Sequence, residues 1–272
     1  ITNPIVPLLL CSVMRIIVLL NLESSINGFE IKIVPFFNSF FILSIYVFFI
    51  LNLKYDYIII MKKIENIRSQ YNLAVLNKQD LHPEPMDQFK IWFSDLLDTD
   101  ISEPTAMVLS TYSKDTGSTS RVVLLKDIEV DGFVFYTNYD SLKAQQISAN
   151  KNIALCFFWP HMQRQVRITG FAIKLSEEKS NIYFKSRPRQ SQLAAVASTQ
   201  SQIIKSRDDL EDRFRVLSQK YHNKTIPKPK KWGGYKVVLE SIEFWQGRTN
   251  RMHDRFRYDK TEDQWSIVRL DP

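Results

Sequence analysis

The spacing of hydrophobic and polar residues after position 85 predicts a few helices and a larger number of strands. An amphipathic helix is expected over 86–97, because its large apolar residues recur at spacings of three and four. Two more are expected, one capped by Ser176 and reaching about Ser186, the other over 206–221. Apolar runs predict strands at 106–112, 120–126, 133–138, 153–159, 165–175, 235–246 and 265–270. Many antiparallel strands with interleaved helices are typical of an α+β protein built on a β-barrel.

Residues 1–60 have a different composition and are not expected to be part of this fold. The stretch 33–53 is a run of 21 residues without a charged side chain, long enough to cross a bilayer, so a membrane anchor is one interpretation. Pro35 and Asn38 interrupt the run, the chain starts with isoleucine, and an ordinary polar sequence opens at Met61. We therefore favour a gene-model artefact for 1–60, followed by an N-terminal arm over 61–85 and a barrel domain over 86–272.

Charge and cysteine usage narrow the possible partners. The net charge is +7, and all of the excess lies in 61–272, because three basic and three acidic residues cancel in 1–60. Such an excess favours an anionic partner, either nucleic acid or a phosphorylated small molecule. Two cysteines, Cys11 and Cys156, exclude a disulfide scaffold and fit a reducing, cytoplasmic location. The sequence has no C-x-x-C or H-E-x-x-H motif, so no protein-bound metal is expected.

The segment after the predicted strand 235–246 has the most informative polar pattern. Arg251, His253 and Arg255 recur at spacing two, which places the three side chains on one face if the segment is extended. Like charges on one face repel, so an anionic group is expected opposite them. A lone histidine usually has a structural role, and Trp245 alone is more typical of a core. The flanking arginines favour a binding or catalytic site.

Two strand ends could contribute to an anion site, although each has a bland alternative. Arg121 and Lys126 bound an apolar strand, where their spacing places them on opposite faces unless the strand bulges. Solvated ends of an ordinary core strand explain them equally well. Tyr136 and Thr137, followed by Lys143, offer hydroxyls and an ammonium that suit a phosphate, or simply form a polar turn.

A third candidate follows at the end of the predicted helix 176–186. Tyr183 and Arg187 share one helix face, Pro188 ends the helix, and Ser191 is expected from the loop beyond. These three groups could form a phosphate cradle, and the alternative is an exposed helix end where Arg187 complements the dipole. Gln165, at the start of its strand, could bind the edge of a heterocycle or lie on a solvated face.

Taken in order, these stretches resemble the pyridoxamine 5′-phosphate oxidase family from about Arg68 to Pro272. The motifs are Arg121–Lys126, Phe135–Asn138, Arg164–Val166, Tyr183–Pro188, Trp232–Gly234 and Glu243–Gly247, followed by Arg251-x-His253-Asp254-Arg255. Each motif is weak alone, but their shared order is specific. The resemblance implies an FMN-binding split β-barrel with flanking helices that works as a homodimer, with FMN held at the subunit interface.

The resemblance also implies roles for individual positions. The family's FMN contacts fall on Arg121, Val122, Val123, Leu124, Leu125, Lys126, Tyr136, Thr137, Lys143, Gln165, Gln200, Ser201, Trp245 and Arg255. Its substrate contacts fall on Arg68 and Tyr71 in the arm and on Lys126, Tyr183, Arg187, Ser191, Arg251 and His253. Arg251 and His253 are the implied catalytic residues. One position departs from the family, because Leu142 stands where an arginine is usual, which predicts weaker FMN binding.

The implied activity is oxidation of pyridoxamine 5′-phosphate and pyridoxine 5′-phosphate to pyridoxal 5′-phosphate, in vitamin B6 metabolism. A hydride equivalent passes from the substrate C4′ to FMN, O2 is the acceptor, H2O2 is released, and the amine yields ammonia. The alternative is a non-catalytic split-barrel protein that stores or senses FMN or pyridoxal phosphate, which would not need Arg251 and His253. Nucleic-acid binding is disfavoured because the basic residues are scattered among acids. A membrane partner is expected only if 1–60 is part of the protein.

Overall fold

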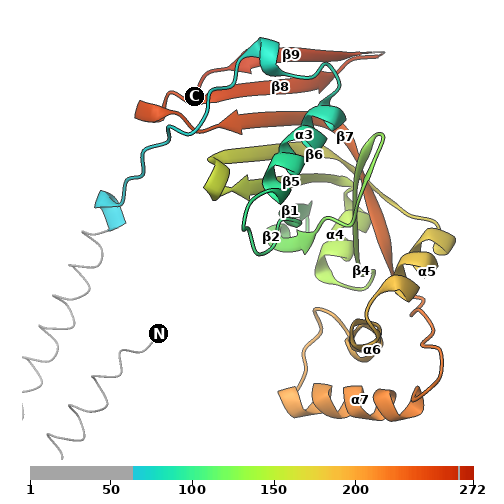
Figure 1. Ribbon diagram of the computed structural model, residues 1–272. Helices are drawn as coiled ribbons and strands as arrows, with labels where there is room; N and C mark the ends of the chain where they lie inside the picture. Colours follow the sequence, from blue (N-terminus) through green and yellow to red (C-terminus); the bar gives the residue numbers. More distant parts are fainter. Residues whose placement is uncertain (1–63, 263) are drawn as a thin grey trace, which may run out of the picture. The chain divides into compact units, whose positions relative to one another are not determined.

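The computed structural model describes residues 64–262 and 264–272, so the predictions for 1–60 lie outside the described part (Figure 1). The chain divides into two compact units after Ser69, and the elements discussed below belong to the unit Gln70–Pro272. Among the described residues, no helix combines the length and the apolar character that crossing a membrane requires.

A single antiparallel sheet runs through this unit. Its strands are β1 (Ala106–Ser113), β2 (Gly117–Leu124), β3 (Asp127–Glu129), β4 (Gly132–Asn138), β5 (Asn152–Trp159), β6 (Arg164–Lys174), β7 (Trp232–Gln246), β8 (Asp254–Lys260) and β9 (Trp265–Leu270). The main path is β2-β1-β5-β6-β7-β4-β3, and β8 joins β7 and β9 off this path. The α+β class and the dominance of antiparallel strands agree with the prediction.

The long strand β7 divides the sheet into two parts. One of its edges pairs with β6, whereas the other pairs with β4 over Trp232–Val238 and with β8 over Ser241–Gln246. The partner changes near a bulge at Gly170, where a Cβ atom would lie 2.0 Å from the Val238 carbonyl oxygen, so only glycine fits. Because β2 also contacts β4, the strands of the main path, β1 to β7, curl into a barrel that is open on the side of β8 and β9 (Figure 1).

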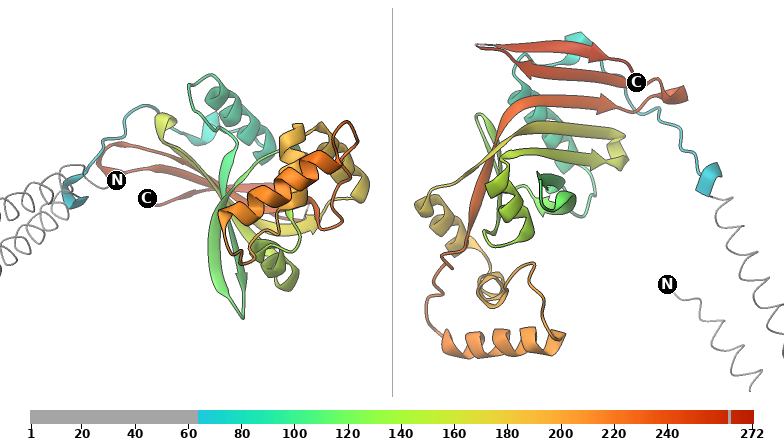
Figure 2. Two further views of the ribbon diagram at one scale, coloured as in Figure 1. Left: turned by 90° about the horizontal axis from the view of Figure 1, so that it is seen from below. Right: turned by 180° about the vertical axis from the view of Figure 1, so that it is seen from behind.

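Helices cover the barrel and extend one end of it. They are η1 (Lys78–Asp80), α3 (Pro85–Leu97), α4 (Leu142–Ala149), η2 (Pro160–Met162), α5 (Glu177–Ser186), α6 (Arg189–Ala197), α7 (Arg207–Lys220) and η3 (Thr249–Arg251). Figure 2 shows α5, α6 and α7 grouped together, at the end of β7 that is farthest from β8 and β9.

Helix α3 supplies the central part of the core, as its sequence predicts. Phe89, Trp92 and Leu96 are buried, and Phe93 packs partly against the same cluster. The Phe89 ring lies 4.7 Å from that of Phe133, between centroids, so the helix packs onto the inner face of β4. Burying a side chain of this size contributes about 1.5–3 kcal/mol.

A second, smaller core lies beneath the three helices at the other end. Phe184, Leu193, Ile226 and Trp232 form it. The predicted apolar face of α7 contributes Phe214, Leu217 and Tyr221 as partly buried neighbours, while Leu210 stays exposed.

The predicted elements differ from the observed ones in extent, and some observed elements were not predicted. The strand expected over 120–126 ends at Leu124, and α4, α6 and β8 were not predicted. Helix α4 buries Lys143 and Gln146 together with Ala144 and Ile147, so its buried face is half polar and gives no apolar periodicity. Helix α6 starts at Arg189, directly after Pro188, so this proline precedes a helix as well as following one.

Candidate functional site

A cavity of about 780 Å³ lies between strands β2 and β4 of the barrel and the helices at its end. Residues from β2, β4, α4, α5, α6 and the start of β7 line it: Arg121, Val122, Val123, Leu124, Lys126, Tyr136, Thr137, Asn138, Leu142, Lys143, Tyr183, Arg187, Pro188, Ser191, Ala195, Ser198, Gln200, Ser201 and Trp232. We call it the cationic cavity.

The charge of this lining is entirely positive. Arg121, Lys126, Lys143 and Arg187 contribute four cations, and no aspartate or glutamate stands among the described lining residues. Four like charges around one space repel each other unless an anion enters. Lys126 and Arg121 both line the cavity. Because β2 ends at Leu124, Lys126 lies outside the strand, and the alternation expected for a regular strand does not extend to it.

Arg187 is the least satisfied of the four cations. Its Nη1 atom is buried and has no hydrogen-bond partner, and its guanidinium carbon lies 4.8 Å from the centre of the Trp232 ring. Burial lowers the pKa of Arg187 relative to an exposed arginine. A buried donor without an acceptor costs free energy in the unliganded protein, so this atom is suited to an incoming oxyanion.

Lys143 is held at the start of α4, next to the cap residue Ser141. Its side chain is buried, and its Nζ donates to Thr137 Oγ1 at 3.3 Å and to Ser141 Oγ at 3.4 Å. Burial, and then the charge of Arg121, lower the pKa of Lys143 to about 8. The amino end of α4 adds its own partial positive charge at this wall of the cavity.

A network of buried polar groups fixes Arg121. Its Nη1 donates to Thr111 Oγ1 at 2.6 Å and its Nη2 to Thr119 Oγ1. Both hydroxyls in turn donate to the Oε1 of Gln146, which is on α4 and almost fully buried. The network ties the strand that carries Arg121 to the helix that carries Lys143, so the two cations are held by one rigid assembly.

Aromatic rings form the opposite wall. Tyr136 stacks on Tyr183 with centroids 3.9 Å apart, and Trp232 stacks on Tyr136 at 5.4 Å. Burial raises the pKa of Tyr136 to about 12 and also raises that of Tyr183. Both phenols therefore keep their protons near neutral pH and can donate hydrogen bonds to an anion.

Most of the residues predicted to bind cofactor or substrate meet in this cavity. Ser191 lies on α6 rather than in a loop, because the chain re-enters a helix at Arg189. Leu125 is the exception in the stretch 121–126: its side chain is in the core and its backbone N–H donates to Thr105 O at 2.8 Å. Gln200 accepts hydrogen bonds from Thr137 Oγ1 and the backbone N–H of Asn138, which brings its loop to β4.

The remaining predicted residues form a second group at the other end of β7. Gln165 pairs with Trp245 across β6 and β7, and Trp245 pairs with Arg255 across β7 and β8, so these three form one row over three strands. The Trp245 ring lies 4.6 Å from His253 and 5.8 Å from Tyr71. We call Tyr71, Trp245 and His253 the ring cluster.

The expectation that Arg251, His253 and Arg255 share one face of a strand is wrong. Strand β8 begins only at Asp254, and Arg251 lies in the short helical turn η3 with a positive φ of 62°. Arg251 is exposed and forms no hydrogen bond or ion pair within the described part of the chain. The anion expected opposite Arg255 is Glu243 of the same chain, whose Oε1 accepts from Arg255 Nε at 2.8 Å.

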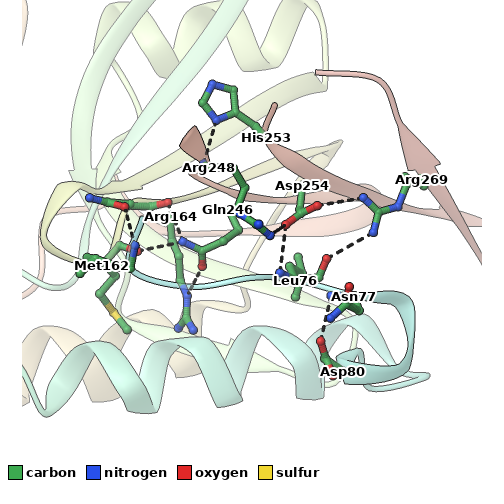
Figure 3. Close-up of polar contacts among 12 residues, drawn as sticks. Leu76, Asn77, Asp80, Met162, Arg164, Gln246, Arg248, His253, Asp254 and Arg269 are labelled. Atoms are coloured by element: carbon green, nitrogen blue, oxygen red, sulfur yellow. Dashed lines mark hydrogen bonds and ion pairs between the residues drawn. The ribbon is translucent and has the colours of Figure 1, made fainter. Parts of the chain in front are cut away.

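His253 has a defined tautomer. The backbone N–H of Arg248 donates to His253 Nδ1 at 3.1 Å, so the ring proton is on Nε2 (Figure 3). Burial, together with the charges of Arg251 and Arg255, lowers the pKa of His253 and keeps the ring neutral at physiological pH. The side chain can therefore donate one hydrogen bond through Nε2.

The two groups are too far apart to contact one small ligand in a single subunit. Trp232 lines the cationic cavity and Trp245 belongs to the ring cluster. Trp245 follows thirteen residues after Trp232, a path of about 40 Å along β7 at about 3.3 Å per residue. Arg68 falls in the other compact unit, so its role remains a prediction.

Some lining residues had no predicted role. Trp232 and Ser198 line the cavity, and of these only Trp232 had a usable signal. Its two following glycines have no room for a Cβ atom, since the one at Gly234 would lie 2.8 Å from the Tyr136 ring. A tryptophan before such a pair indicates close packing of an aromatic wall.

Comparisons with known proteins agree with this geometry. The family model described as pyridoxamine 5′-phosphate oxidase matches residues 93–221, and the model of the pyridoxine 5′-phosphate oxidase C-terminal dimerisation region matches 232–272. The chain is 46% identical over 212 residues to the pyridoxine/pyridoxamine 5′-phosphate oxidase of Gloeothece citriformis (strain PCC 7424), covering 78% of this chain and 99% of that protein. The enzyme of the same name from Vibrio vulnificus (strain YJ016) is 47% identical over 210 residues, covering 77% and 100%.

Solved structures share the architecture. PhzG from Burkholderia lata 383, in complex with tetrahydrophenazine-1-carboxylic acid, superposes with a TM-score of 0.69 at 26% identity over 74% of this chain and 99% of that one. A pyridoxamine 5′-phosphate oxidase-related, FMN-binding protein from Nostoc punctiforme PCC 73102 gives a TM-score of 0.56 at 15% identity, over 71% and 98%, which supports the fold alone.

Proposed function

The chain belongs to the pyridoxine/pyridoxamine 5′-phosphate oxidase family, and we propose on this premise that it oxidises both phosphorylated vitamers to pyridoxal 5′-phosphate with FMN as its cofactor. For the amine the balance is pyridoxamine 5′-phosphate, O2 and water giving pyridoxal 5′-phosphate, ammonia and H2O2. When bound, FMN supplies the redox chemistry by accepting a hydride equivalent from the substrate carbon and passing the electrons to O2.

The acid-free cationic cavity is the observation that carries this proposal. Two phosphorylated molecules must be held, and four cations surround a space of about 780 Å³ without a single described carboxylate. The Nη1 atom of Arg187 is buried without an acceptor, and a phosphate oxygen would supply one. The donors present therefore fit a phosphorylated cofactor and a phosphorylated substrate.

The cations divide into two sets according to their support. Gln146 ties the helix of Lys143 to the strand of Arg121, and we assign these two cations to the FMN phosphate. Lys126 and Arg187, with the protonated Tyr183 and with Ser191 of α6, are assigned to the substrate phosphate. Arg121 and Lys143 are held by hydrogen bonds within the protein, so the set assigned to the FMN phosphate needs little reorganisation on binding.

The complete site requires two subunits. The ring cluster and the row of Gln165, Trp245 and Arg255 lie about 40 Å along β7 from the cationic cavity, so we assign them to the partner's site. An exposed apolar sheet face supports a dimer, because Val108 of β1 pairs with Val122 and lies on the same face as Phe158. A two-fold axis then forms two identical sites, each made of the cationic cavity of one subunit and the ring cluster of the other, with FMN at the interface.

Arg251 and His253 act on the substrate from this second group. The Arg251 guanidinium, free of partners in the described residues, can orient the reacting carbon. His253 holds a proton on Nε2 and can donate it to a polar substituent of the substrate ring. A hydride route needs little from a general base, so positioning rather than proton abstraction is their main task.

The test is an absorption spectrum of the purified protein supplied with FMN, recorded without oxygen before and after addition of pyridoxamine 5′-phosphate. We expect flavin bands that bleach on addition of substrate and return on exposure to air, with pyridoxal 5′-phosphate formed. Flavin bands that persist with substrate would support the non-catalytic alternative. A protein that is colourless, monomeric and unable to take up FMN would refute the proposal.

A further inference from the structure

The turn that carries Arg251 has a backbone conformation that is unfavourable without outside support. Asn250 and Arg251 have φ values of 56° and 62°, and neither residue is glycine. Non-glycine residues persist in the left-handed region only where surrounding structure fixes them. Within the turn, the backbone N–H of Met252 donates to Thr249 O at 3.1 Å. A second bond spans the turn, from the backbone N–H of Arg248 to His253 Nδ1 at 3.1 Å, so the geometry of the turn depends on where Arg248 is held.

Asp254, the first residue of β8, holds Arg248 by an ion pair. Its side chain is buried, and its Oδ2 accepts hydrogen bonds from the backbone N–H of Leu76 at 3.1 Å and from Arg248 Nη1 at 2.9 Å. Its Oδ1 accepts from Arg269 Nη1 at 2.9 Å (Figure 3). One carboxylate thus joins the arm, the start of the turn and the last strand.

The charge of Asp254 is maintained by these donors. Burial alone would raise its pKa, but hydrogen bonds from Arg269, Leu76 and Arg248 outweigh burial and lower it. Arg269 also donates through Nη2 to Leu76 O at 3.4 Å and lies 4.4 Å from the Phe256 ring centre, so its position does not depend on Asp254 alone.

The same contacts lead directly to the ring cluster. Arg248 binds Asp254 with its guanidinium and His253 Nδ1 with its backbone N–H, so it connects the carboxylate to the imidazole. On the arm, Leu76 follows five residues after Tyr71, whose ring lies 5.9 Å from that of His253. Asp254 therefore contacts Arg248, which binds His253, and the arm that carries Tyr71. It does not itself belong to the ring cluster.

We propose that Asp254 is a positioning residue of the oxidase. It holds Arg248, and through it the turn and the His253 tautomer, so that Arg251 and His253 Nε2–H are presented in one fixed arrangement. This inference rests on the proposed function, since it assigns Asp254 to residues that act on the substrate. The competing view is that Asp254 only adds ion pairs that stabilise β8 and β9.

Asp254→Asn is the sharpest test, because it keeps the shape and removes the charge. In this variant the side-chain NH2 group faces an arginine N–H, and two donors cannot hydrogen-bond to each other. The contact that holds Arg248 therefore weakens. On the flavin-loaded protein we expect kcat for pyridoxamine 5′-phosphate to fall roughly tenfold to a hundredfold. FMN affinity should change little, because the cations assigned to its phosphate lie in the cationic cavity. Arg269→Gln, which removes one donor at a half-exposed side chain, should lower kcat less.

A second readout does not depend on turnover. The chain has four histidines, so 15N-histidine NMR of the protein, assigned with His253→Gln, can report the ring nitrogens of His253. In the wild type the shifts should be those of the Nε2–H tautomer. In Asp254→Asn they should move toward a mixture of tautomers, because the Arg248 N–H no longer fixes Nδ1.

Asp212→Asn is the matched control. Asp212 forms an ion pair of 2.7 Å with Arg215 on the exposed face of α7, so the charge change is the same while the turn is untouched. We expect wild-type kcat and an unchanged His253 spectrum in this variant.

The outcomes separate this inference from the proposed function. If Asp254→Asn keeps the His253 tautomer, and kcat falls only as far as a lower thermal midpoint accounts for, Asp254 is structural and the inference is wrong. A wild-type protein without oxidase activity would overturn the proposed function instead, and the NMR comparison would still decide whether Asp254 fixes His253.

Discussion

The unpaired guanidinium of Arg187 makes a prediction with opposite signs in the free and liganded protein. In the free protein its Nη1 is buried without an acceptor, which costs about 1–3 kcal/mol. Its contact with Trp232, 4.8 Å from the ring centre, offsets about 0.5–2 kcal/mol of this. Arg187→Met keeps a long apolar stem and removes the unmatched donor. We therefore expect the free energy of unfolding of the substrate-free protein to rise by about 1 kcal/mol.

Binding of a phosphorylated ligand should reverse this effect. Charge-assisted hydrogen bonds to a phosphate contribute about 1.5–3 kcal/mol, so Arg187→Met should bind pyridoxal 5′-phosphate roughly 10- to 150-fold more weakly. The assays are urea denaturation of the flavin-loaded protein at fixed protein concentration, and isothermal titration with pyridoxal 5′-phosphate.

Arg189 provides the control for this substitution. Its guanidinium donates to Lys224 O at 3.1 Å and to Tyr221 O, so its donors are matched within the protein. Arg189→Met should lower the free energy of unfolding by about 1 kcal/mol and leave ligand affinity unchanged. If Arg187→Met instead destabilises the free protein and binds pyridoxal 5′-phosphate like the wild type, Arg187 is a structural residue and not a phosphate ligand.

Three further predictions concern the cofactor side and the second group of residues. The pKa of Lys143, about 8, lies below the ordinary 10.5. At pH values between these two, Lys143 is protonated in the unfolded chain and deprotonated in the folded one. The unfolding free energy of the FMN-free protein should therefore rise with pH in this range, and FMN affinity should fall. Lys143→Met should remove both trends in denaturation and titration curves. Leu142→Arg should tighten FMN binding by about 1–3 kcal/mol in a flavin fluorescence titration, and an unchanged Kd would show that this wall does not contact the phosphate. Arg251→Ala should lower steady-state turnover at least roughly tenfold with a full complement of FMN, and an undiminished rate would remove Arg251 from the site.

Elements with a clear hydrophobic period, and the order of the motifs, could be predicted from the sequence alone. Helix α3 was predicted over 86–97 because its apolar residues recur on one face, and those same residues are buried. The motifs around Arg121, Tyr136 and Tyr183 indicated an anion site, and side chains from all three line the cationic cavity. Each of these signals is local, since it depends on residue type and spacing within one element.

How these groups face each other depends on long-range contacts that no local pattern in the sequence indicates. Arg251 leaves the expected strand face because the chain turns through two positive φ values before β8 begins at Asp254, a residue that Leu76 and Arg269 contact from far away in sequence. Helix α4 buries Lys143 without showing an apolar periodicity, because polar residues share its buried face. Hydrogen bonds from β1 and β2 compensate the burial of its Gln146. Long-range register, set by β7 pairing with β4 at one end and β8 at the other, separates the cavity from the ring cluster. Spacing along a chain fixes the direction of neighbouring side chains, whereas contacts between distant segments fix where those directions converge.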